Sequence, residues 1–119
     1  MINRPQFRND DPLYSLLRDG DIDGFNAKKK TVEGTIDLSL CDFRSLDLKG
    51  LDASNIDFRN SYFRQADLRG IDFSQSNLEG ASINGSKISG AYFPKELTAN
   101  EVELSLIHGT RMRYSMGDH

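Results

Sequence analysis

Residues 36–95 read IDLSL-CDFRS-LDLKG-LDASN-IDFRN-SYFRQ-ADLRG-IDFSQ-SNLEG-ASING-SKISG-AYFPK, which divides into twelve groups of five. Eleven of the twelve central residues are large and apolar: Leu38, Phe43, Leu48, Phe58, Phe63, Leu68, Phe73, Leu78, Ile83, Ile88 and Phe93, with Ala53 as the exception. A period of five is neither the 3.6 of a helix nor the 2 of a long strand. The pattern therefore predicts short units that stack and share one core.

The first residue of each group is predicted to point inward together with the central one. This second set is Ile36, Cys41, Leu46, Leu51, Ile56, Ser61, Ala66, Ile71, Ser76, Ala81, Ser86 and Ala91. The other positions are mostly polar and are expected to face water. Glycine recurs at the last position of a group, where the chain is expected to turn a corner.

Two stretches carry a family resemblance. Ala66-Asp67-Leu68-Arg69-Gly70 and Asn77-Leu78-Glu79-Gly80-Ala81 match the pattern A(D/N)LXX. The chain thus resembles the pentapeptide-repeat family, and its ending resembles a bacterial subgroup of that family. The resemblance implies an all-β solenoid, a right-handed quadrilateral β-helix with about twenty residues per coil, here in three coils with helical N- and C-terminal caps.

The chain is predicted to have three parts: an N-terminal helical cap (1–35), the repeat (36–95), and a C-terminal capping helix and tail (96–119). Residues 1–10 are polar and expected to be loosely held. A helix is expected to begin at Asp11-Pro12 and stop at Gly20, and a second to begin at Asp21 or Asp23. Near the C-terminus, Thr98 and Glu101 form a predicted capping box for a helix that ends at Gly109.

Composition favours a soluble cytoplasmic protein. The 119 residues have a net charge of −3, and 37% of them are hydrophobic. No apolar run approaches the ~18 residues of a membrane span, and the N-terminus has no signal-peptide core. The single cysteine, Cys41, excludes an intramolecular disulfide and fits a reducing compartment.

Candidate catalytic groups fit structural roles better. Seven aspartates precede central residues at regular intervals, and basic residues two positions later are suited to pair with them. Cys41 lies at an inward position as a small hydrophobe. The repeat has no histidine, and Gly85-Ser86-Lys87 lacks the upstream glycine of a phosphate-binding loop. The sequence therefore predicts that the protein is not an enzyme and has no catalytic, cofactor-binding or metal-binding residues.

The preferred function is a non-enzymatic structural or protein-interaction module, with a protein partner or a second copy bound through the C-terminal helix. No small-molecule substrate, direct nucleic-acid contact or membrane contact is expected. The residues suggested as contacts are Tyr62, Tyr92, Leu104, Met112 and Tyr114. The alternative, drawn from the resemblance, is a DNA mimic that inhibits or protects DNA gyrase. It is weakened because the repeat holds eight acidic against seven basic residues.

Overall fold

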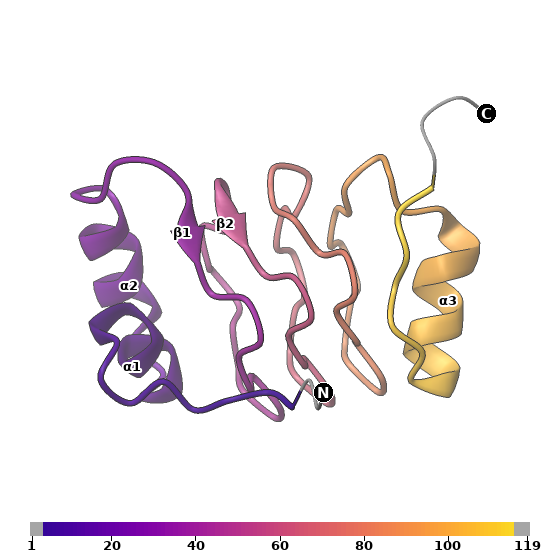
Figure 1. Cartoon of the computed structure of the whole chain (residues 1–119), viewed down its shortest axis with the longest axis horizontal. Helices are drawn as coiled ribbons and strands as arrows, with labels where there is room; N and C mark the ends of the chain where they lie inside the picture. The colour runs from indigo at the N-terminus through magenta and orange to yellow at the C-terminus, as the bar shows by residue number, and fades with distance from the viewer. Residues whose placement is uncertain (1–3, 116–119) are drawn as a thin grey trace.

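The computed structural model describes residues 4–115. The elements in order are α1 (Pro12–Arg18), α2 (Ile22–Lys29), β1 (Ile36–Asp37), β2 (Ile56–Asp57) and α3 (Ala99–His108). The helices α1 and α2 lie at one end of a stack of windings, and α3 lies at the other end (Figure 1). The repeat therefore lies between two helical ends.

Successive windings of the repeat pair in parallel at a spacing of twenty residues. β1 pairs with β2 through Ile36 and Ile56, and the same register continues as isolated bridges from Asp42 to Tyr62 to Ser82. Regular strand in the described part of the chain is limited to these two dipeptides. It is short because each group of five residues keeps the extended conformation for only two or three residues before it turns.

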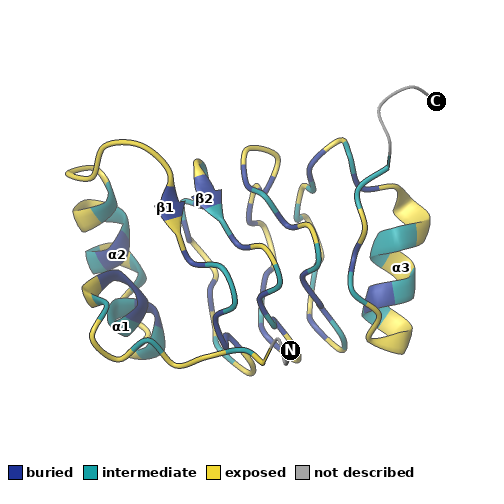
Figure 2. Cartoon of the chain, in the orientation of Figure 1, coloured by how far each residue is buried: buried dark blue, intermediate teal, exposed yellow. Residues whose placement is uncertain are grey.

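The predicted inward positions form the core. Ten of the twelve central residues are buried, and Ile88 and Phe93 are partly buried against the core at the C-terminal end. Buried stretches recur along the windings between the helical ends (Figure 2). The rings of Phe43 and Phe63 stack with centroids 5.1 Å apart, one winding from each other. Buried serines at the first position satisfy their hydroxyls within the chain: that of Ser61, for example, donates to the Leu38 carbonyl at 2.8 Å.

The corners use the left-handed backbone conformation at the last position of ten of the twelve groups. Glycine is placed there five times, but Leu40, Ser45, Asn55, Asn60 and Gln65 also have φ between 54° and 64°. Left-handed backbone costs about 1–2 kcal/mol for a residue with a Cβ. The packed windings on either side must therefore hold these corners in place.

The N-terminal segment covers the first winding. Asp11 caps α1 and Asp21 caps α2 through side-chain hydrogen bonds, which confirms both predicted helix starts. Tyr14 and Phe25 are fully buried in the common core. The expectation of a loose N-terminus is wrong for Gln6, because its backbone pairs with both Leu40 and Asp42 and continues the stack by one more bridge.

The C-terminal helix begins and ends as predicted. Thr98 accepts from the Glu101 amide at its start, and Gly109 has a left-handed φ of 74° at its end. The reciprocal half of the capping box is not formed, because the Glu101 carboxylate accepts from the Arg113 amide instead. None of the three described helices is long and apolar enough to cross a membrane.

Candidate interaction surfaces

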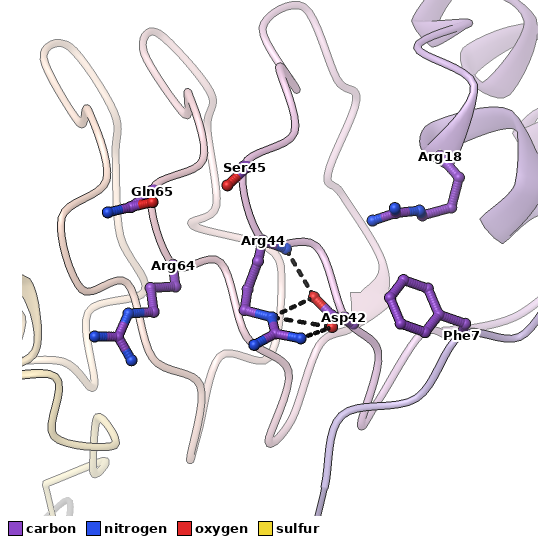
Figure 3. Close-up of a pocket in the computed structure, with 7 residues that line it drawn as sticks. All are labelled: Phe7, Arg18, Asp42, Arg44, Ser45, Arg64 and Gln65. Atoms are coloured by element: carbon purple, nitrogen blue, oxygen red, sulfur yellow. Dashed lines mark hydrogen bonds and ion pairs between the residues drawn. The ribbon is translucent and has the colours of Figure 1, made fainter.

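Basic side chains collect on one face of the repeat. We call the outer surface of residues 42–45, 62–65 and 82–84 the arginine face, because parallel bridges stack these three segments. Its first two windings and the end of α1 surround a hollow of about 360 Å³, lined by Arg18, Arg44, Arg64, Ser45 and Gln65 among others. Figure 3 shows the three arginines among the side chains around this hollow, with Arg44 between Arg18 and Arg64 in the view.

Aspartates pair with basic residues two positions later. Asp42 binds Arg44, Asp47 binds Lys49, Asp57 binds Arg59, and Asp67 binds Arg69. Lys49 also reaches Asp67 in the next winding at 2.9 Å. In each pair, the backbone amide of the basic residue also donates to the aspartate carboxylate, as in the 3.0 Å bond from the Arg44 amide to Asp42. The aspartates therefore fix the corners and neutralise the adjacent cations.

Asp42 departs from the outward placement expected of these aspartates. Its side chain is only 2% exposed, because Phe7 and the N-terminal segment pack beside it. Burial by itself raises the pKa of a carboxyl group, but hydrogen bonds from the Arg44 side chain and amide outweigh it and hold the pKa of Asp42 below its usual value. Asp42 therefore remains an anion that occupies Arg44.

Arg64 breaks this pairing rule. The residue two positions before it is Tyr62 instead of aspartate. No carboxylate pairs with Arg64 among residues 4–115. The guanidinium of Arg111 lies 5.7 Å from the centroid of the Tyr62 ring. The arginine face thus carries more positive than negative charge at its centre.

The second surface is an apolar groove at the C-terminal end. We call it the C-terminal groove; Ile88 and Phe93 of the last winding line it together with Leu97, Val102, Leu106 and Ile107. Ile107 is 59% exposed, and Tyr92 beside Phe93 is 68% exposed. Such exposure of large apolar side chains at one end of the stack is typical of a contact surface.

The backbone at this end is capped on only part of the last winding. The amide of Gly80 donates to Met112, and that of Gly85 donates to Leu106. Within the described chain, the amides of Ile88 and Phe93 have no corresponding partner, although their counterparts one winding earlier are all bonded. An open strand edge therefore lies beside the C-terminal groove.

The five residues suggested from the sequence have different placements. Tyr92 is exposed, whereas Tyr62 and Leu104 are half-buried. Met112 is 0% exposed, because the tail folds back and its amide donates to the Ala81 carbonyl. The Tyr114 hydroxyl accepts from the Leu78 amide at 2.8 Å. Met112 and Tyr114 thus cap the chain's own last winding, while Ile88, Phe93 and Ile107, which sequence reasoning did not select as contacts, line the groove.

Possible catalytic groups are enclosed or paired. Cys41 is fully buried, and burial raises the pKa of its thiol to about 12. The Arg69 side chain beside Asp67 holds the pKa of that carboxyl well below its usual range. No three His, Cys, Asp or Glu side chains within residues 4–115 gather in a way that could hold a metal ion.

Comparison with known proteins identifies the repeat. Residues 56–93 match the family model for pentapeptide repeats in eight copies. No curated protein and no solved structure gives a significant match. Pentapeptide repeats imply a fold of the β-helix type, and the proteins that carry them are generally non-catalytic structural modules. The matched residues carry the same period as the pentads before them, and the chain contains pentapeptide repeats over residues 56–93.

Proposed function

We propose that this chain is a non-enzymatic protein-interaction module that pairs with a second copy through its C-terminal end. The observation that carries the proposal is the C-terminal groove, where Ile107, Phe93 and Ile88 lie beside backbone amides that lack partners in the described chain. A second copy covers both features at once, since a two-fold contact sets the same apolar patch against itself. Burial of such a patch contributes roughly 25 cal/mol per Å².

We also infer that the repeat is a right-handed, four-sided coil with one pentad on each side. The bridges at a spacing of twenty residues support four pentads per winding, and the family resemblance supports the right hand. The rigid stack then holds the C-terminal groove and the arginine face at fixed positions for their partners.

The pairing is tested by light scattering on the full chain at micromolar concentrations. We expect the mass of a dimer, and we expect Ile107→Glu to give a monomer because it places a charge in the groove. The matched control is Val32→Glu, which changes an exposed apolar residue (40% exposed) near the opposite end of the stack. A monomer mass for the unaltered chain, or equal dissociation by both variants, would contradict the proposal.

A further inference from the structure

We propose that the arginine face binds a short acidic segment of a partner protein. This inference rests on the proposed role as an interaction module and gives the chemistry of one partner. Among the basic residues at the fourth position of a pentad, Arg44, Lys49, Arg59 and Arg69 each bind an aspartate of the same pentad. Arg64 follows Tyr62 and has no carboxylate within the described chain, so a carboxylate from outside completes the pattern.

The neighbouring groups extend the site beyond one arginine. Arg18 and Arg44 flank the same hollow as Arg64, and Figure 3 shows all three side chains along it. Arg44 bonds Asp42 through Nε and Nη2, so its Nη1 is left for a second acceptor. Stacked windings are spaced at roughly 4.8 Å, so guanidinium groups follow one another closely enough to receive carboxylates from one extended segment.

Aromatic side chains border the same site. The Arg18 guanidinium lies 4.7 Å from the centroid of the exposed Phe7 ring, and Tyr62 precedes Arg64. Tyrosine and arginine are enriched among the residues that dominate protein interfaces. The site thus combines positive charge with aromatic side chains at its border.

Carboxylates on one side limit the length of the ligand. The pentads before the arginine face carry Asp37, Asp57 and Glu79, and Arg59 is their one basic residue. A long polyanion such as a nucleic acid would lie across these carboxylates, and the net charge of −3 would repel it. A short acidic peptide fits within the positive region, and this difference favours a protein segment over nucleic acid.

The probe is a fluorescently labelled peptide of alternating glutamate and serine, about six residues long, which spans roughly 20 Å when extended. A peptide with glutamine in place of glutamate and a single-stranded DNA of similar charge serve as comparisons. We expect saturable binding of the acidic peptide, measured by fluorescence anisotropy at low salt. Arg64→Glu should weaken it at least about tenfold, and Arg64→Gln should weaken it less.

The matched control is Lys87→Glu, which makes the same change of charge on another face, at a side chain for which the described structure shows no ion pair. We expect it to change binding by less than about twofold. Equal weakening by Arg64→Glu and Lys87→Glu, no saturable binding, or tighter binding of the DNA would overturn the inference. Absence of peptide binding by a chain that still has a dimer mass would overturn this inference alone, and a monomer that binds the peptide would overturn only the proposed pairing.

Discussion

The phenolic hydroxyl of Tyr14 donates a 2.6 Å hydrogen bond to the backbone carbonyl of Asp42 and so joins α1 to the first winding of the repeat. Both partners are buried, and the Tyr14 ring lies 5.5 Å from the ring of Phe43. Elsewhere in the repeat the equivalent carbonyl accepts from a backbone amide of the preceding winding, as that of Tyr62 does from Phe43. Tyr14 supplies the donor at the first winding. The N-terminal helix therefore closes the stack through a polar contact as well as through apolar packing.

Tyr14→Phe should destabilise the chain although the ring remains. It removes the donor and leaves the buried Asp42 carbonyl without a partner, at a cost of about 1–3 kcal/mol. Urea unfolding measures this loss. Tyr92→Phe is the control, because Tyr92 is 68% exposed and should change the free energy of unfolding by under about 0.5 kcal/mol. A loss of similar size in both variants would contradict the role given to the buried bond.

Substitution of Phe63 tests whether the central residues of the pentads point into the core. It is fully buried, stacks on Phe43, and meets the ring of Phe58 edge-on with centroids 5.3 Å apart. Phe63→Ala should cost about 3–5 kcal/mol through lost burial and a cavity. The neighbouring Arg64→Ala should cost under about 0.5 kcal/mol, since that side chain is exposed. If denaturant unfolding gave equal losses, the alternation of inward and outward residues would be wrong.

The core was predictable from the sequence because a period of five places apolar side chains at fixed positions. Phe43 and Phe63 are twenty residues apart and stack as the repeat requires. The pairing of Gln6 with the first winding was not predictable, because it uses backbone atoms and leaves no side-chain pattern. The alternation of Arg111, Met112 and Arg113 is typical of an extended segment, but it does not show whether Met112 faces the same chain or a partner.

The arginine face and the C-terminal groove also differ in how far the sequence predicts them. The sequence shows that Arg64 lacks an aspartate two residues before it, because Tyr62 stands at that position. It does not show that Arg18 of α1 lines the same hollow. The C-terminal groove depends on how α3 lies over Ile88 and Phe93. The spacing of apolar residues within α3 does not fix that arrangement, since Ile107 fits an inward position on the helix and is 59% exposed.

Alanine variants of two glycines at equivalent corners distinguish backbone strain from a steric clash. Gly70 and Gly80 have φ of 75° and 80°. A Cβ at Gly70 would meet nothing within 4 Å, but a Cβ at Gly80 would lie 2.0 Å from Oδ1 of Asn60. Both alanine variants should lose about 1–2 kcal/mol from left-handed strain, and Gly80→Ala should lose about 1 kcal/mol more from overpacking. Equal losses in urea unfolding would mean that Asn60 moves aside freely.

A DNA-mimic action on gyrase is not expected. Such mimicry needs a strongly anionic surface, whereas Arg18, Arg44 and Arg64 place positive charge on one face of this short stack. Purified protein at low micromolar concentration should leave gyrase supercoiling unchanged in a plasmid assay. Arg64→Glu serves as a comparison, because added negative charge should be the more favourable case for inhibition. Potent inhibition by the unaltered chain would restore the DNA-mimic interpretation.

Alkaline pH should destabilise the folded chain. Burial raises the pKa of the Cys41 thiol from 9.0 to about 12, and burial likewise raises the pKa of Tyr14 from 10.0 to about 12. The unfolded chain therefore releases these protons at lower pH than the folded chain does, so the stability that the neutral groups provide is complete below pH 9 and is lost as the pH rises toward 12. Urea unfolding near pH 7 and about pH 10.5 should show a falling free energy of unfolding, with a smaller fall in Cys41→Ala. An identical fall in Cys41→Ala would show that the thiol ionises as readily in the folded chain as in the unfolded one, which its complete burial in the common core argues against.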